Sequence, residues 1–324
     1  MNERDKIKNA IEANNLSKKY GKLLAVDSIS FKVKEGEIFG FLGPNGAGKT
    51  TTINMIIGLS KITAGKVKVN GQTRVEKIQE SIGVVGSESN LYPELSGFDN
   101  LCFAASLYGM RKEKRQKRAG QLLTEFGLAD AADRLFGAYS KGMKRKLTIA
   151  AGIIHKPKIL FLDEPTTGID VGSARQIRRL IADLNREGTT IFLTTHYIEE
   201  AERLCDRVAF LVEGKIRHID KTENLLNQAH QEKIIEFLID KDCLKNKNTL
   251  LEKLSDYEVE LTKSKIRIHV EERTEINKFI DLFNQSNCNV YEAKLIRPSL
   301  EDVFVKITGL DIEEMKNNKE KGGK

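Results

Sequence analysis

The sequence predicts an α/β protein with a mixed, largely parallel sheet, followed by a small C-terminal α+β domain. Three observations favour this fold class. Short aliphatic runs alternate with longer helical patterns before residue 220, which is typical of parallel strands covered by helices. A glycine-rich segment, Gly43–Thr51, joins one of these runs to a helical pattern. After about residue 220 the chain changes to apolar segments separated by charged turns.

Six runs of β-branched and aliphatic residues in the first part are predicted as strands, because each is short and bounded by glycine, proline or charge. They are Ile38–Leu42, Val67–Val69, Ile82–Val85, Ile159–Leu162, Thr190–Thr194 and Val208–Val212. Helical patterns cover Lys114–Phe126 and Ser173–Arg186. The alternating pattern from Asn14–Tyr20 through Ile29–Lys34 indicates antiparallel strands at the start. A ligand site is expected beyond the carboxyl ends of the parallel strands.

The chain is predicted to form a first domain over residues 1–225 and a two-layer α+β domain over residues 226–310. The second domain has no glycine-rich turn and no cluster of ligand residues, so its composition assigns it no chemistry. Residues 311–324 are charged and glycine-tailed, so a frayed tail is expected there. The apolar segments of the second domain are Ile234–Ile239, the helical Leu244–Leu254, Tyr257–Leu261, Ile266–Val270, Thr274–Asn284 and Asn289–Leu295.

Composition excludes disorder as the dominant state, since 40% of the 324 residues are hydrophobic and 31% are charged. The net charge of +7 is uneven: residues 1–220 carry 35 basic and 26 acidic side chains, and residues 221–324 carry 18 and 20. Aromatic residues make up only 6% and do not alternate with basic ones. No nucleic-acid partner is therefore expected, and a solvated lysine-rich surface is favoured.

No apolar run approaches the ~18 residues that a membrane span needs, and the charged N-terminus lacks the apolar centre of a secretory signal. A cytoplasmic protein is therefore expected. Cys102, Cys205, Cys243 and Cys288 lie far apart, without the paired spacing of a zinc site. They are expected to be reduced and structural.

The segment after Ile38–Leu42 fits the phosphate-binding pattern G-x-x-x-x-G-K-[ST], and a helix is predicted to begin near Thr50. Its glycines let backbone N–H groups turn toward one point, and the helix N-terminus adds a positive dipole. Lys49 offers a charge to the β- and γ-phosphates of a nucleoside triphosphate, and Thr50 offers a hydroxyl to Mg²⁺. The candidate nucleotide-binding residues are Gly43, Pro44, Asn45, Gly46, Ala47, Gly48, Lys49, Thr50 and Thr51.

Two consecutive carboxylates follow the apolar strand Ile159–Leu162. Neighbouring residues of a strand point to opposite sides, so Asp163 and Glu164 are expected to have different roles. We assign Asp163 to Mg²⁺, partly through water, and Glu164 to the water that attacks the γ-phosphorus, as general base. The sequence thus predicts hydrolysis of the bound triphosphate.

With these motifs in order, residues 12–220 resemble the ATPase subunits of ABC transporters, which have a P-loop NTPase core. The segment 139–143, Tyr-Ser-Lys-Gly-Met, is similar to the signature motif of that family, and Asp163–Asp170 is similar to its Walker B strand end and D-loop. His196 follows Glu164 by 32 residues, where the family has its switch histidine. Tyr20 matches the aromatic residue that stacks on adenine.

The resemblance implies ATP and Mg²⁺ as cofactors, with Glu164 and His196 as catalytic residues. It implies a head-to-tail dimer, expected to be a homodimer, in which Ser140 and Gly142 contact the partner's nucleotide in trans. A separate membrane permease is expected to bind near a helical insertion at about residues 99–136 and to hold the chain at the inner face of the cell membrane. For the basic run Arg111–Arg118 in this insertion, a solvated helix face is favoured over contact with acidic lipid head groups.

The signature variant and the tail Arg297–Phe304 are similar to those of bacterial subunits that drive drug, antibiotic or ion export. An exporter motor is therefore the favoured function. One departure is Ser87, which stands where the family has glutamine; its part in Mg²⁺ binding is left open, with Glu88 or a bridging water as substitutes. Two alternatives are a soluble ABC ATPase that acts on ribosomes, nucleic acid or cluster assembly, and a regulator that binds ATP but hydrolyses it poorly.

Overall fold

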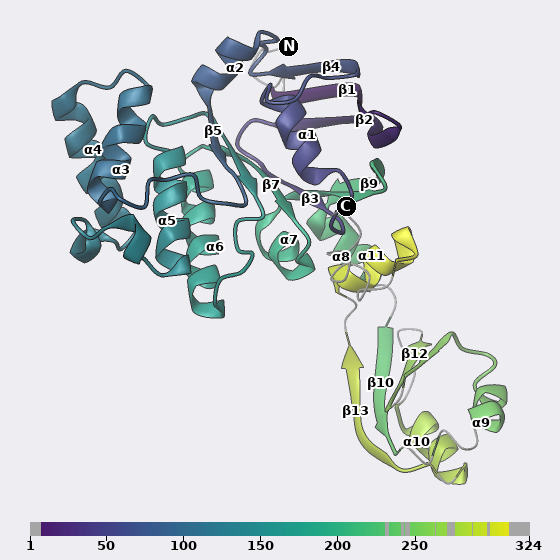
Figure 1. The fold of residues 1–324 in the computed structure, drawn as a ribbon. Coiled ribbons are helices and arrows are strands. Elements are labelled where there is room, and N and C mark those ends of the chain that lie inside the picture. The colour runs from purple at the N-terminus through teal and green to yellow at the C-terminus, as the bar shows by residue number, and fades with distance from the viewer. Residues whose placement is uncertain are drawn as a thin grey trace, which may run out of the picture. The chain divides into compact units, whose positions relative to one another are not determined.

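The computed structural model describes residues 8–230, 233–240, 243, 247–262, 264–270, 276–286, 288–296 and 299–310. The chain divides into two compact units: unit 1 includes the chain up to Thr222, and unit 2 runs from Glu223 to Gly309 (Figure 1). The division lies at the start of helix α8 (Thr222–His230), near the expected boundary at residue 225. The tail expected over residues 311–324 lies outside the described residues, as do Arg297 and Pro298.

Unit 1 is built on a six-stranded sheet in the order β5-β6-β7-β3-β8-β9. Neighbouring strands from β5 to β8 pair in parallel, and β9 pairs with β8 in antiparallel. Every residue of β3, β6 and β7 is buried, as expected for parallel strands covered on both faces. The bounds are β3 Ile38–Leu42, β5 Ile82–Val85, β6 Ile159–Asp163, β7 Thr190–Thr195, β8 Arg207–Val212 and β9 Lys215–Lys221.

A second, antiparallel sheet in unit 1 has the order β2-β1-β4 and confirms the predicted antiparallel start. It packs on the large sheet through Phe31 of β2, whose ring centroid lies 5.0 Å from that of Phe41 and 6.0 Å from that of Phe192. These rings belong to one hydrophobic cluster drawn from both sheets. The cluster supports β3 and β7 beneath the loops that follow them. The bounds are β1 Asn9–Tyr20, β2 Leu23–Lys34 and β4 Ala64–Val69.

From β3 to β8, one or more helices lie between successive strands (Figure 1). The longest, α6, buries Ala174, Ile177 and Ile181, which lie three and four residues apart on one face. The predicted helical insertion contains α3 and α4, and α3 contacts both α4 and α5. The bounds are α1 Lys49–Ile56, α2 Val75–Ser81, α3 Gly97–Leu107, α4 Lys112–Glu125, α5 Lys141–Gly152, α6 Val171–Arg186 and α7 Ile198–Leu204.

Unit 2 has an antiparallel four-stranded sheet in the order β11-β12-β10-β13. Phe279 and Phe283 of α10 pack against Phe237 of β10, with ring centroids 5.9 and 4.8 Å from it, in a hydrophobic core of its own. The sheet with its helices forms a small α+β fold. The bounds are β10 Lys233–Ile239, α9 Lys247–Lys253, β11 Val259–Leu261, β12 Lys265–Val270, α10 Ile276–Gln285, β13 Val290–Ile296 and α11 Leu300–Thr308.

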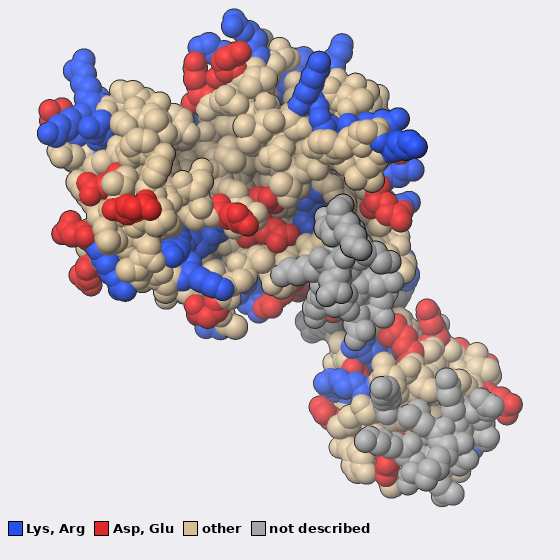
Figure 2. Space-filling model, in the orientation of Figure 1, with Lys and Arg blue, Asp and Glu red and all other residues tan. Residues whose placement is uncertain are grey.

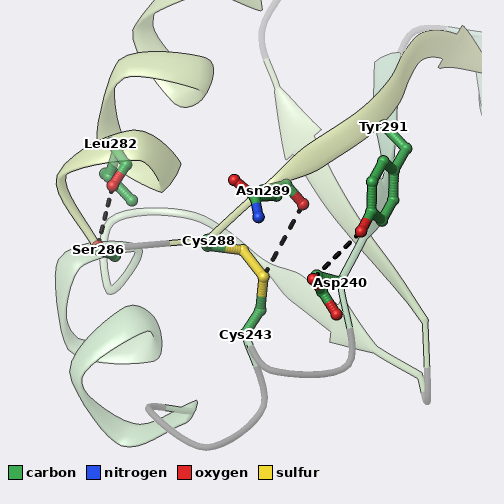
Figure 3. Close-up of a disulfide and its surroundings, with 7 residues drawn as sticks. All are labelled: Asp240, Cys243, Leu282, Ser286, Cys288, Asn289 and Tyr291. Atoms are coloured by element: carbon green, nitrogen blue, oxygen red, sulfur yellow. Dashed lines mark hydrogen bonds between the residues drawn. A yellow bond between two sulfur atoms is a disulfide. The ribbon is translucent and has the colours of Figure 1, made fainter.

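The expectation that all four cysteines are reduced is wrong for two of them. Cys243 and Cys288 form a disulfide in unit 2 (Figure 3). They are 45 residues apart in the sequence, but their Cα atoms lie 4.8 Å apart. The end of β10 pairs with the start of β13, Ile239 opposite Val290, and this pairing brings the cysteine-bearing segments together. Cys102 and Cys205 of unit 1 are free thiols.

Candidate functional site

Part of the predicted site lies where β3, β6 and β7 end, and these strands are neighbours in the large sheet. The loop after β3 leads into α1, Asp163 ends β6, and His196 follows β7 directly. Because parallel strands present their carboxyl ends at one edge of a sheet, segments far apart in the chain meet there. A glycine-rich loop therefore lies at this edge of the sheet, together with a lysine, two carboxylates and a histidine.

The loop after β3 has a backbone that suits phosphate binding. Gly46 and Gly48 have φ angles of 80° and 101°, and a Cβ atom at Gly48 would lie 2.6 Å from the carbonyl oxygen of Ala25. Glycine is therefore required at position 48. Helix α1 begins at the next residue, Lys49, and the first N–H groups of a helix have no carbonyl partner within it. Such a loop and helix end offer N–H donors to a phosphate.

Lys49 is a buried cation beside this loop. Its Nζ donates to the carbonyl oxygens of Gly43 and Pro44 at 2.8 and 3.0 Å, and it lies 3.6 Å from Glu164 Oε1. Burial lowers the pKa of Lys49, and the charges of Glu164 and Asp163 oppose that effect only in part. The Lys49 ammonium group is therefore poorly solvated, and it would strongly attract the negative charge of a phosphate that binds in the loop.

Asp163 is held by hydroxyl groups from two other elements. Thr50 Oγ1 of α1 donates to Asp163 Oδ2 at 2.9 Å, and Thr194 Oγ1 of β7 donates to Asp163 Oδ1. Hydroxyl and carboxylate oxygens are hard ligands of the kind that Mg²⁺ takes, while the ion keeps several waters. These residues fit a Mg²⁺ ion held by few protein atoms. The described part of the chain holds no group of three or more His, Cys, Asp or Glu residues that could hold a metal ion.

Glu164 does not continue the strand that precedes it. Strand β6 ends at Asp163, and Glu164 has a φ of 48°, a left-handed conformation that is uncommon for residues with a side chain. The N–H of Glu164 donates to the carbonyl oxygen of Thr194 at 3.0 Å, which holds this turn. The two carboxylates are thus separated by a left-handed turn, and not by the strand alternation that we expected.

The Glu164 carboxylate has three neighbours that favour its charged form. Thr167 Oγ1 donates to Oε2 at 3.1 Å, while His196 Nδ1 lies 3.1 Å and Lys49 Nζ 3.6 Å from Oε1. Burial raises the pKa of Glu164, but the contact with His196 and the charge of Lys49 outweigh burial and lower the pKa to about 2. The group is therefore an ionised hydrogen-bond acceptor at neutral pH, able to orient a water molecule.

Ser140 and Gly142 lie at the start of α5. Ser140 is exposed, and its Oγ caps the helix by accepting from the N–H of Met143 at 3.2 Å. Among the described residues, no hydrogen bond or ion pair joins Ser140 or Gly142 to the glycine-rich loop or to Glu164. A Cβ at Gly142 would lie 2.3 Å from Ser173 Oγ of α6, so close helix packing also requires this glycine.

Tyr20 and Ser87 lie on the surface of unit 1. Tyr20 ends β1 with 48% of its surface exposed, and its hydroxyl lies 3.3 Å from Ser60 Oγ. The Nζ of Lys18 lies over the ring, 4.6 Å from its centroid, so a planar group that stacks here would use the other face or displace Lys18. Ser87 is exposed in the loop after β5. That loop is tied to α5 by its neighbour Ser89, whose Oγ lies 2.8 Å from Thr148 Oγ1.

Two threonines at this edge, Thr167 and Thr194, are not singled out by the sequence patterns. Thr194 donates to Asp163, and Thr167 donates to Glu164. The sequence signal for them is weak: Thr194 is a hydroxyl at the end of an apolar run, and Thr167 is one of two threonines after Glu164. Their partners depend on strand order and on a turn, which local patterns do not specify.

Comparison with known proteins extends these observations. The family model described as ABC transporter matches residues 26–167. The chain is 35% identical to the linearmycin resistance ATP-binding protein LnrL of Bacillus subtilis (strain 168), over 92% of this chain and 98% of that protein. It is also 35% identical to the bacitracin transport ATP-binding protein BcrA of Bacillus licheniformis, over 92% of this chain and 97% of that protein. These alignments span 305 and 309 residues, so they extend beyond unit 1 into unit 2.

Two solved structures are similar in fold. One is an ATP-binding subunit of an ABC transporter, with a TM-score of 0.62 at 30% identity, covering 68% of this chain and 92% of that chain. The other is a dimeric ATP-binding cassette in a post-hydrolysis state, bound to ADP and Pi. Its TM-score is 0.60 at 28% identity, and the match covers 65% of this chain and 98% of that chain.

Proposed function

This chain belongs to the ABC transporter family as an ATP-binding subunit, and on that premise we propose that two copies of it hydrolyse Mg²⁺-bound ATP to drive export by a separate membrane permease. One observation carries the proposal: Lys49, Asp163, Glu164 and His196 meet at one sheet edge beside the glycine-rich loop. That arrangement supports both triphosphate binding and hydrolysis.

Phosphate binding is assigned to the loop Gly43–Thr51 and to Lys49. The loop supplies neutral N–H donors, and Lys49 supplies the positive charge that they lack. Lys49 Nζ now donates to two loop carbonyls and lies near Glu164, so it is already placed at the loop. The exposed ring of Tyr20 is assigned to the adenine base.

Thr50 and Asp163 are the residues that would hold Mg²⁺, and the hydroxyl of Thr194 keeps the Asp163 carboxylate in place. When bound, the ion neutralises charge on the β- and γ-phosphate oxygens. Glu164 is assigned to the attacking water. With a pKa of about 2, it is a weak base before the reaction begins. We therefore give Glu164 an orienting role in the ground state, with proton acceptance only as the P–O bond to water forms. His196 is assigned to hold this carboxylate in position, since its Nδ1 lies 3.1 Å from Glu164 Oε1.

Ser140 and Gly142 are assigned to the nucleotide of the partner subunit. Two features support a role in trans: Ser140 is exposed at the N-terminus of α5, and the described contacts do not link it to its own glycine-rich loop. A helix N-terminus attracts phosphate, and a solved cassette similar to this chain is dimeric. A homodimer is the simplest assembly that provides both halves of each site.

A separate permease is the proposed membrane partner. Among the described residues, no helix is both long and apolar enough to cross a membrane, and relatives of similar length are named for linearmycin resistance and bacitracin transport. Exposed Tyr92, Phe103 and Leu107 in and beside α3 suit an apolar contact. Lys and Arg side chains project from the surface that α4 forms (Figure 2). The chain would then lie at the inner face of the membrane.

The proposal is tested by ATP turnover and by partner capture. Purified chain should release phosphate from ATP, and removal of Mg²⁺ by EDTA should abolish the release, with Lys49→Ala as the inactive control. Tagged chain expressed in a cell should sediment with membranes and copurify with one polytopic membrane protein. Turnover with Mg²⁺ but association with ribosomes in place of membranes would overturn the export assignment while leaving the ATPase assignment intact.

A further inference from the structure

Arg145 is a buried arginine of α5 whose contacts lie outside its own helix. Only 8% of its surface is exposed. Nε donates to the carbonyl oxygen of Pro165 at 2.8 Å, Nη2 donates to that of Asp163 at 2.8 Å, and Nη1 donates to that of Gly86. One planar guanidinium thus joins α5 to the ends of β5 and β6 and to the turn after Glu164.

These contacts are unusual for a buried charge. Within the described residues, no carboxylate forms an ion pair with Arg145, and its guanidinium donates to neutral carbonyl oxygens. Burial lowers its pKa to about 10, and the charges of Glu200, Asp163 and Glu164 oppose this effect. An apolar side chain would fill the space without the cost of desolvating a cation. The fork geometry of arginine is needed only if the three carbonyls must be held together.

The three carbonyls belong to segments that flank the proposed site. Asp163 and Pro165 are the sequence neighbours of Glu164, and Gly86 directly precedes Ser87. The same region is braced from α7 by Glu200, a residue with 1% exposure whose Oε1 accepts from Thr166 Oγ1 at 2.7 Å. The backbone that carries Asp163 and Glu164 is therefore fixed through side chains of α5 and α7.

We propose that Arg145 is a positioning residue that couples the start of α5 to the catalytic edge of its own subunit. The inference rests on the proposed function, in which Ser140 at the start of α5 contacts the partner's nucleotide. Arg145 lies five residues further along the same helix. When contact between Ser140 and that nucleotide shifts α5, Arg145 therefore displaces the carbonyls of Gly86, Asp163 and Pro165 together. Each nucleotide would then influence the carboxylates that act on the other one.

The test compares Arg145→Met and Arg145→Lys with a matched control, Lys146→Met, on the same helix. The readouts are the dissociation constant of ATP, kcat and KM for hydrolysis, the Hill coefficient for ATP, and the unfolding temperature. We expect Arg145→Met to lower kcat by roughly 10-fold and to bring the Hill coefficient toward one, while the dissociation constant changes less than about threefold. Lys146→Met should behave as the parent.

Arg145→Lys separates positioning from simple support of the fold. Lysine keeps the charge but cannot hold three carbonyls in one plane, so we expect an unfolding temperature near that of the parent together with low kcat and a low Hill coefficient. Three outcomes would each overturn the inference. In the first, Arg145→Lys regains both the unfolding temperature and the kcat of the parent. In the second, both Arg145 variants have parental values, and in the third, neither variant folds. A parent with a Hill coefficient of one would also overturn the inference, whereas a parent that does not hydrolyse ATP would refute the proposed function on which the inference rests.

Discussion

Glu164→Gln removes a negative charge from the candidate site while keeping the size of the side chain. The amide can still accept from Thr167 Oγ1, which now lies 3.1 Å from Glu164 Oε2. The contacts with His196 Nδ1 at 3.1 Å and with Lys49 Nζ at 3.6 Å lose the negative charge that strengthens them. Lys49 and the glycine-rich loop remain, so ATP should still bind.

The expected loss of activity is large. Removing a general base commonly costs ~10²–10⁴ in rate, and we expect kcat to fall within that range. We also expect the dimer to persist with ATP, because the step that breaks the γ-phosphate bond is blocked. Phosphate release measures kcat, and gel filtration with Mg²⁺-ATP measures the dimer.

The same substitution should also change stability in a pH-dependent way. The folded pKa of Glu164 is about 2, below its ordinary value of 4.5, so the ionised carboxylate contributes ~3 kcal/mol to the free energy of unfolding at neutral pH. A depressed pKa gives stability that is present above about pH 4.5 and is lost as the pH falls toward 2. Parent and Glu164→Gln should therefore differ most at neutral pH and converge in acid.

Calorimetry of the unit 1 transition at several pH values measures this difference, with the exposed Glu187→Gln as a matched control. Turnover near the parental rate would refute the assignment of Glu164 to the attacking water. A stability difference that stays constant from pH 7 to acid would refute the electrostatic account of its pKa.

Four other substitutions test neighbouring assignments. Lys49→Ala should weaken ATP binding, measured by nucleotide titration, because it removes the cation beside the loop; parental affinity and ATP-dependent dimerisation would contradict the assignment. Thr194→Val removes the hydroxyl that donates to Asp163 Oδ1, so the Mg²⁺ concentration for half-maximal turnover should rise several-fold while the unfolding temperature changes little. Ser87→Gln should raise ATP turnover or its dependence on the permease by supplying a longer polar side chain; a loss of turnover in Glu88→Ala with no gain in Ser87→Gln would make Glu88 the functional residue.

Much of unit 1 could be predicted because its signals are local. The strand Ile38–Leu42 was predicted with the bounds that the structure has, since a short, mostly apolar run between a charged residue and a glycine is typical of a buried strand. The residues of the phosphate-binding loop could also be predicted from a local signal, because the loop, the strand before it and the helix after it are contiguous in the sequence. The family resemblance then placed Ser140, Gly142 and His196, which composition alone would not have singled out.

Other features depend on contacts between distant segments and have no local pattern. Arg145 looks like one more basic residue of a basic helix, and only the packing of α5 against the ends of β5 and β6 turns it inward. The left-handed turn at Glu164 follows from hydrogen bonding to β7, so strand alternation was the wrong reason for separating the two carboxylates. The pairing of Cys243 with Cys288 likewise depends on how β10 and β13 align.

That disulfide makes the two units respond differently to thiol chemistry. Closing a loop of 45 residues removes chain entropy worth up to ~4 kcal/mol from the unfolded state, whereas a domain of the size of unit 2 has a total stability of roughly 4–13 kcal/mol. Unit 1 holds two free thiols and no described disulfide. A reductant therefore acts on the folding of the C-terminal unit by cleaving this bond, whereas the described part of the nucleotide-binding unit has no disulfide for it to cleave.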